Sequence, residues 1–366
     1  MKMIIGGLSN KKRRAAVLMV FVLLASLLAL GTVAYRKSRQ TAPVTGGYLY
    51  QVYGETTADG EESATPKEEP AHNVLVLGKD YDSNRTDAII CVSFKGDGSI
   101  STLQIPRDTY VCDGDYKGRI NGLMPRYRAE ALERGDDDPT HSGIKAFAEK
   151  IDELFGIKCQ SYVFMDSKAV AQITDTLGGV TVDIPADIDY TDKDREIDLH
   201  LKAGTQTLDG KTASQFIRYR QGYPQADIGR INAQKLFVAA TLDKLQSLSS
   251  VKTAIKLTET VAAYVKTDLT AEETARLVTL MCMAKPDSVL MYTMPGDGVK
   301  VNGGSYYGVF ADKLCEVLEK GFDTKTSATA LGTQSFSSQS GGYRDTDGVT
   351  LASVLKGGLS IPVYAD

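Results

Sequence analysis

The sequence predicts an α/β protein with a central mixed β-sheet flanked by helices. Short apolar runs bounded by glycine or charge, such as 73–78 and 88–94, interleave with amphipathic segments such as 142–156. Strands that alternate with helices along the chain indicate an α/β layer architecture. The length of 366 residues is enough for one large domain with a full core.

The N-terminal segment predicts a membrane anchor. Residues 15–35 carry no charge over 21 positions, which is about the length of a helix that crosses a bilayer. Lys11 to Arg14 precede this run, so residues 1–14 are expected in the cytoplasm and the rest of the chain outside it. A cleavable signal peptide is the alternative, but the run is longer than usual for one. We therefore expect a single-pass protein of the cell membrane with an extracytoplasmic domain.

The remaining chain divides by composition into three parts. Residues 36–70 are polar and rich in Gly, Thr, Pro and Glu, which predicts a flexible linker. Residues 71–323 carry the apolar patterns and form the predicted domain. Residues 324–366 are rich in Ser, Thr and Gly, which predicts a flexible tail.

Apolar patterning locates the elements of the domain. The helix over 142–156 has apolar residues at helical spacing, with Ser142 as its cap and Gly156 as its stop. Further helices are predicted at 167–179 and 308–322, and residues 211–284 are mainly helical in pattern. Strands are predicted at 73–78, 88–94, 100–105, 162–165, 180–184 and 288–294.

Charge and cysteine usage argue against one class of protein and one kind of metal site. The net charge of −4 argues against a nucleic-acid binder, which is usually basic. Five cysteines without a CxxC pair, together with three histidines, argue against a structural zinc site.

Carboxylates gather after the first predicted strand. Asp80, Asp82 and Asp87 lie between the ends of the first two strands, a pattern that suits Mg²⁺. A calcium loop is excluded because Arg85 and Cys91 stand where glycine and glutamate are needed. A solvated acidic loop is the alternative for this segment taken alone.

Arginines recur at the predicted strand ends and in one later segment. The guanidinium group matches phosphate oxygens two at a time, so this distribution favours a phosphate or pyrophosphate ligand. Structural ion pairs, such as one between Arg107 and Asp108, are the alternative. The arginines are Arg85, Arg107, Arg119, Arg218, Arg220 and Arg230.

A helix is predicted after the Gly222/Pro224 break. Asp227, Arg230 and Gln234 lie at i, i+3 and i+7, which places them on one helical face. A neighbouring apolar stripe would pack on the core; it comprises Ile231, Val238, Leu242 and Leu245.

The spaced motifs resemble the LytR-CpsA-Psr family of cell-envelope proteins. The anchor is followed in order by "RTDAII", "IPRDTY", "RIN" and "RYR…DIGRINAQ" over about residues 71 to 245. The resemblance implies an enzyme that moves a glycopolymer, such as teichoic acid or capsule, from a polyprenyl-pyrophosphate carrier onto a peptidoglycan hydroxyl, with release of polyprenyl phosphate. The implied partners are the lipid-linked glycan, peptidoglycan and the membrane, with no nucleic acid.

The resemblance also implies roles for individual residues. Asp80 and Asp87 would hold Mg²⁺, and Arg107 would act in catalysis. Asp108 and Asp227 are both candidates for the general base, and either could instead orient an arginine. The pyrophosphate would be bound by Arg85, Arg107, Arg119, Arg218, Arg220 and Arg230, with Gln234 close by.

The sequence departs from the family pattern at two positions of its motifs. Arg119 stands where the family usually has lysine, and Ala233 stands in the place of an arginine. Ala233 favours one alternative function, a non-catalytic polyprenyl-phosphate binder that regulates wall synthesis. The other alternative is a pyrophosphatase that hydrolyses the carrier linkage. A transcription attenuator fits poorly with an acidic, exported chain.

Overall fold

The structure is a computed structural model, and it describes residues 71–79, 85–223, 227–248, 250–336 and 342–359. Residues 15–35 and the linker lie outside this part of the chain. Among the described residues, no helix is both long and apolar enough to cross a membrane.

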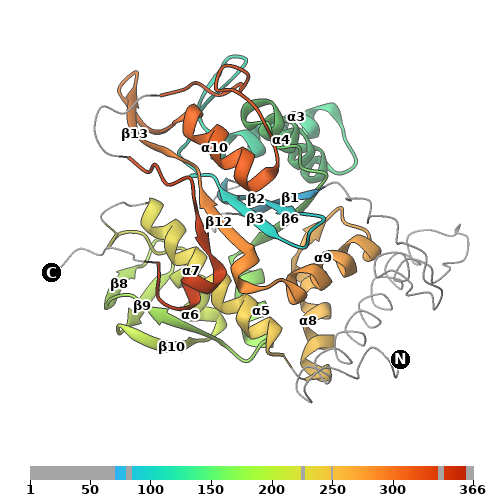
Figure 1. The fold of residues 1–366 in the computed structure, drawn as a ribbon, viewed down its shortest axis with the longest axis vertical. Coiled ribbons are helices and arrows are strands. Elements are labelled where there is room, and N and C mark those ends of the chain that lie inside the picture. Colours follow the sequence, from blue (N-terminus) through green and yellow to red (C-terminus); the bar gives the residue numbers. More distant parts are fainter. Residues whose placement is uncertain (1–70, 80–84, 224–226, 249, 337–341, 360–366) are drawn as a thin grey trace, which may run out of the picture.

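A seven-stranded mixed sheet with the order β11-β6-β1-β2-β3-β12-β15 forms the centre of the fold (Figure 1). β1 runs antiparallel to β2 and parallel to β6, while β3 runs antiparallel to β2 and parallel to β12. The sheet confirms the predicted α/β class. Its strands are β1 (His72–Lys79), β2 (Thr86–Phe94), β3 (Ile100–Gln104), β6 (Ser161–Asp166), β11 (Lys266–Thr267), β12 (Val289–Thr293) and β15 (Val349–Thr350).

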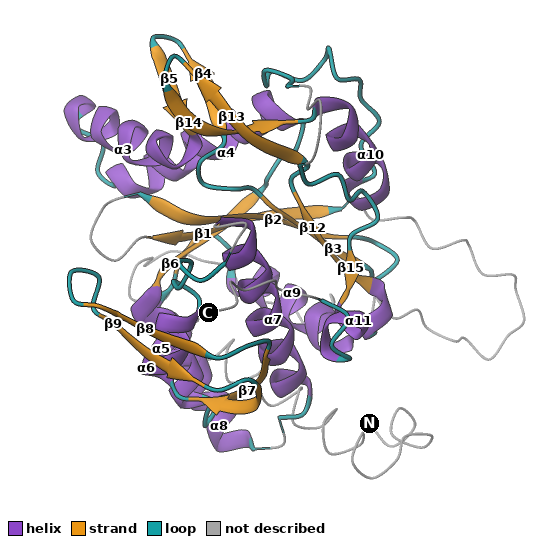
Figure 2. Cartoon of the chain, turned by 90° about the vertical axis from the view of Figure 1, so that its left-hand side faces the viewer, coloured by secondary structure: helices purple, strands orange, loops and turns teal. Residues whose placement is uncertain are grey.

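Helices cover both faces of this sheet (Figure 2). Alternate residues of β1 point to opposite sides, so Leu75 and Leu77 belong to one apolar cluster and Val74 to the other. Helices α3 (Leu123–Arg134), α4 (Pro139–Phe155) and α10 (Ala311–Phe322) lie on one side. The other side carries α5 (Ser167–Thr176), α6 (Gly210–Phe216), α7 (Asp227–Gln246), α8 (Val251–Tyr264), α9 (Ala271–Met283) and α11 (Leu351–Leu355).

In the described part of the chain, four two-stranded sheets lie outside the central sheet, and most of their strands were not predicted. The predicted strand 180–184 exists, but it pairs with β10 rather than joining the main sheet. The pairs are β4 (Tyr110–Asp113) with β5 (Tyr116–Arg119), β7 (Val180–Ile184) with β10 (Gly204–Leu208), β8 (Ile188–Asp192) with β9 (Ile197–Leu201), and β13 (Gly296–Val301) with β14 (Gly304–Val309).

Helix boundaries differ from the predictions for local reasons. α4 starts before Ser142, because Asp138 caps the helix by accepting a hydrogen bond from the His141 backbone N–H. Its predicted stop is confirmed, since Gly156 adopts a left-handed conformation with φ 69°. α10 starts only at Ala311, because the residues before it pair in β14.

The segment after residue 323 is not the uniformly flexible tail that its composition predicts. β15 pairs with β12 at the edge of the central sheet, and α11 follows it directly. Leu351 and Val354 are 1% and 4% exposed within the apolar cluster that includes α7. Burial of this short apolar run outweighs the polar composition around it.

Candidate functional site

The predicted polar residues meet at one edge of the central sheet. Lys79 at the end of β1 pairs with Thr86 at the start of β2, and the ends of β3, β6 and β12 reach the same edge. Asp87 therefore lies next to Arg107, which follows β3 closely. Ligands of α/β proteins commonly bind outside the carboxyl ends of parallel strands.

Asp87 is the centre of an ion-pair network. Its Oδ1 accepts a hydrogen bond of 2.5 Å from Arg107 Nη1, and its Oδ2 lies 3.4 Å from Arg230 Nη1. Arg230 Nη2 also donates to the Asp87 backbone oxygen at 3.0 Å. Asp227 completes the network, with its Oδ1 2.6 Å from Arg230 Nη2 and 3.7 Å from Arg107 Nε. The predicted helical face of Asp227 and Arg230 thus points at the strand ends.

Burial and charge oppose each other at this network. Burial disfavours ionisation of Asp87, but the Arg230 and Arg107 guanidiniums outweigh it and hold the pKa of Asp87 below its ordinary value. The Arg230 side chain is only 2% exposed, and Asp87 and Asp227 compensate its buried charge.

A cavity of 390 Å³ opens beside the network. All six arginines predicted from the sequence to bind phosphate line this cavity. The cavity therefore brings together chain segments more than 100 residues apart. Two aspartates and a seventh arginine, Arg195, also line it. The full lining is Arg85, Asp87, Arg107, Asp108, Arg119, Asn121, Arg195, Ile197, Arg218, Arg220 and Arg230.

Seven arginines against two aspartates give the lining of this cavity an excess of positive charge, which favours an anion as its ligand. Arg220 has no carboxylate within 4 Å among the described residues. Its own burial and the neighbouring cations Arg107, Arg195 and Arg230 lower the pKa of Arg220. Bringing like charges together in a partly buried cavity costs free energy, and a bound polyanion would offset that cost.

Asp108 and Arg119 form a separate pair at the rim of the cavity. Arg119 Nε lies 3.1 Å from Asp108 Oδ1, and Arg119 Nη2 donates to the Ser305 backbone oxygen at 3.2 Å. Asp108 lines the cavity, whereas Asp227 contacts Arg230 and Arg107 and is not part of the lining.

Other predicted positions take different places. Gln234 does not line the cavity: its Nε2 donates to the Ile217 backbone oxygen at 2.9 Å, and its Oε1 accepts a hydrogen bond from Gln104. Asp80 lies outside the described residues. Ala233 is fully buried in an apolar cluster, and Val238, expected in the core stripe, is 40% exposed.

Arg195 is the charged residue of the lining that sequence reasoning missed. It lies in the turn of the β8–β9 hairpin, a hairpin that was not predicted. The alternation of apolar and polar residues in "IDYTDKDREIDLHL" (188–201) was the signal that could have revealed both the hairpin and its turn.

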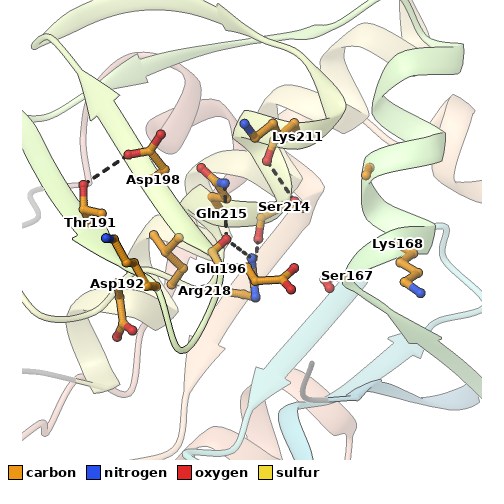
Figure 3. Close-up of a pocket in the computed structure, with 13 residues that line it drawn as sticks. Ser167, Lys168, Thr191, Asp192, Glu196, Asp198, Lys211, Ser214, Gln215 and Arg218 are labelled. Atoms are coloured by element: carbon orange, nitrogen blue, oxygen red, sulfur yellow. Dashed lines mark hydrogen bonds between the residues drawn. The ribbon is translucent and has the colours of Figure 1, made fainter. Parts of the chain in front are cut away.

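A second and larger cavity of 590 Å³ adjoins the first (Figure 3). The two share Ile197 and Arg218 as lining residues. Basic, acidic and hydroxyl side chains from α5, α6 and the β8–β9 hairpin form its wall, including Lys168, Asp198 and Lys211.

The donor set for a divalent cation is sparse in the described part of the chain. It contains no group of three or more His, Cys, Asp or Glu residues placed to hold a metal ion. Two carboxylates line the cavity: Asp108, which pairs with Arg119, and Asp87, which contacts Arg107 and Arg230. Mg²⁺ commonly takes one or two protein carboxylates and completes its shell with phosphate oxygens and water, so Asp87 fits such an ion only together with a phosphate ligand.

The chain is similar to several enzymes of teichoic-acid attachment. It is 28% identical over 256 residues to the polyisoprenyl-teichoic acid–peptidoglycan teichoic acid transferase TagU of Oceanobacillus iheyensis, covering 69% of this chain and 75% of that one. It is 22% identical to TagU of Bacillus subtilis, covering 85% and 96%.

Solved structures share the fold. The crystal structure of Bacillus subtilis TagV matches with a TM-score of 0.55 at 24% identity, over 70% of this chain and 99% of that one. The structure titled TagT bound to LIIa-WTA matches with a TM-score of 0.53 at 23% identity, over 76% and 98%. The family model LytR_cpsA_psr matches residues 47–323. This chain belongs to the LytR_cpsA_psr family.

Proposed function

We propose that this protein is a glycopolymer ligase of the cell wall. It transfers a glycan from a polyprenyl-pyrophosphate carrier to a peptidoglycan hydroxyl and releases polyprenyl phosphate. The cavity lined by seven arginines carries this proposal, because guanidinium groups match the charge and the oxygen geometry of a diphosphate. The TagU relatives are teichoic acid transferases that act on polyisoprenyl-teichoic acid and peptidoglycan, which supports this choice of glycan and acceptor.

The reaction is a phosphoryl transfer. The acceptor hydroxyl oxygen forms a bond to the phosphorus nearer the glycan, and the bond from that phosphorus to the bridging oxygen breaks. The bridging oxygen leaves with polyprenyl phosphate, and the hydroxyl proton passes to a base. Negative charge moves toward the leaving phosphate, so arginine contacts that strengthen with it lower the barrier.

Individual residues take distinct roles in this scheme. Arg107 and Arg220 bind the diphosphate in the cavity and stabilise the leaving phosphate. Asp108 is the preferred base, because it lines the cavity and lies at its rim. Asp227 instead orients Arg230 and Arg107, which it contacts at 2.6 and 3.7 Å. Both aspartates were candidates for the base on sequence grounds.

Mg²⁺ is proposed as the cofactor. Asp87 would hold it, together with Asp80 from outside the described residues. The ion would neutralise charge on the diphosphate when bound. Because Asp87 also contacts Arg107 and Arg230, its carboxylate would connect a bound ion to these arginines.

The membrane anchor over residues 15–35 completes the proposal. A long polyprenyl chain leaves the bilayer at a cost of about 0.8 kcal/mol per CH₂. An anchored domain avoids this cost by working where the lipid already lies.

The test uses the full chain in detergent with a labelled polyprenyl-pyrophosphate oligosaccharide and peptidoglycan fragments, with and without Mg²⁺. Arg107→Ala is expected to reduce transfer by about 10²-fold or more. Arg134→Ala is the matched control, since Arg134 is an exposed arginine paired with Asp136. Label on peptidoglycan supports the ligase. Release of oligosaccharide phosphate alone indicates a pyrophosphatase, and binding without turnover indicates a regulator.

A further inference from the structure

The turn of the β8–β9 hairpin forms the partition between the two cavities. Arg195 lines the arginine-rich cavity, Glu196 lines the larger polar cavity, and Ile197 lines both. Any movement of this turn therefore changes the walls of both cavities at once.

Arg218 holds the turn from the end of α6 (Figure 3). Its Nε donates to the Ser214 backbone oxygen at 3.0 Å, which fixes the guanidinium against the helix. Its Nη1 and Nη2 donate to the backbone oxygens of Arg195 at 3.1 Å and of Glu196 at 3.4 Å. Gln215 Nε2 reaches the same Glu196 oxygen at 3.4 Å. The predicted phosphate ligand thus directs three of its nitrogens to main-chain carbonyls.

The backbone of the turn needs this support. Glu196 has φ 52°, a left-handed conformation that costs free energy for a residue other than glycine. Such conformations persist where surrounding contacts hold them, and they cluster at functional sites. The bonds from Arg218 and Gln215 to the carbonyls of the turn supply that restraint.

Arg195 offers its charge to the cavity. Its contact with a carboxylate, Asp192, is long at 3.8 Å, and its side chain is 44% exposed. It is also one of the cations whose proximity, after burial, lowers the pKa of Arg220. Arg195 and Arg220 both line the 390 Å³ cavity, so one bound anion can contact both.

We propose that Arg195 is a further diphosphate-binding residue, and that Arg218 is a positioning residue that places Arg195 by holding the turn. This inference rests on the proposed diphosphate site. It reverses the expectation from the sequence, in which Arg218 was a direct ligand and Arg195 was not considered.

Calorimetric titration of the full chain in detergent with inorganic pyrophosphate tests the binding role. Arg195→Ala is expected to weaken the affinity by about tenfold or more, the effect of losing one charge-assisted contact. Arg134→Ala is expected to leave the affinity unchanged, because Arg134 is an exposed arginine that is not part of the cavity lining. An Arg195→Ala affinity equal to that of the control overturns the proposal.

A double-mutant cycle tests the positioning role. If Arg218 acts through Arg195, then Arg218→Ala weakens pyrophosphate binding when Arg195 is present. In the Arg195→Ala background, Arg218→Ala causes little further loss of affinity. Arg218→Lys keeps the charge but lacks the fork that spans the two turn carbonyls, so it is expected to resemble Arg218→Ala. It also serves if Arg218→Ala fails to fold.

The outcomes separate this inference from the proposed function. Additive losses, or an Arg218→Lys variant that binds as the wild type does, overturn the positioning role. A wild type that binds pyrophosphate but transfers no glycan overturns the ligase and leaves the Arg195 measurement valid. A wild type that does not bind pyrophosphate overturns both.

Discussion

Neutralising Asp87 should destabilise the folded protein by an amount that the structure allows us to work out. Asp87 contacts Arg107 and Arg230, whose side chains are 14% and 2% exposed. Removing one partner of a buried pair costs about 3–5 kcal/mol when the other charge is left uncompensated. Asp227 still lies 2.6 Å from Arg230, so the remaining charge keeps one partner. We therefore expect Asp87→Asn to lower the free energy of unfolding by about 2 kcal/mol.

The pH dependence of this loss follows from the direction of the pKa shift. The folded-state pKa of Asp87 lies below its ordinary value of 3.8. The carboxylate therefore contributes its full stability above that value, and the contribution is lost as the pH falls through the folded pKa. The difference between wild type and Asp87→Asn should be constant near neutral pH and shrink under acid conditions.

Guanidinium denaturation of the full chain in detergent, followed by circular dichroism, measures these differences. Asp187→Asn is the matched control, because Asp187 pairs with Lys202 in an exposed contact with side chains 58% and 86% exposed. Exposed pairs contribute about 0–1 kcal/mol, so this variant should resemble the wild type. If Asp87→Asn is as stable as Asp187→Asn at pH 7, the ion-pair network does not stabilise Arg230 as argued.

Three further predictions concern stability, each checked by the same denaturation method. Burial lowers the pKa of Lys235 to about 8, so the free energy of unfolding of the wild type should rise between about pH 8 and 10.5. Lys235→Met should abolish that rise and increase the free energy of unfolding at pH 7 by about 3 kcal/mol at most. Leu351→Ala should cost about 2–3 kcal/mol because Leu351 is 1% exposed; a neutral effect would mean that α11 is not packed. Gly229→Ala should cost about 1–3 kcal/mol, since a Cβ there would lie 2.3 Å from Tyr223 Cβ. An unchanged stability would contradict the close packing of Gly229 in α7 against Tyr223.

The sequence by itself determined the α/β class and the chemical character of the site. Strands such as 73–78 and 88–94 are continuous apolar runs, and apolar runs of that length are buried in a sheet whatever their partners. The arginines proposed to bind phosphate could be picked out because guanidinium chemistry is recognisable from residue type, and the motifs around Arg107 and Arg230 are specific.

The tertiary structure decided which side chains line the cavity and which contacts hold them there. Arg195 enters the cavity because β8 pairs with β9, and Arg218 turns to the carbonyls of that hairpin. The position of an arginine in the sequence does not reveal whether its N–H groups will donate to a phosphate or to a backbone carbonyl. The tail after residue 323 joined the core for a related reason: β15 is stable only because β12, about 60 residues earlier, offers an open edge. Pairings between distant segments depend on the assembled fold, so local composition could not reveal them.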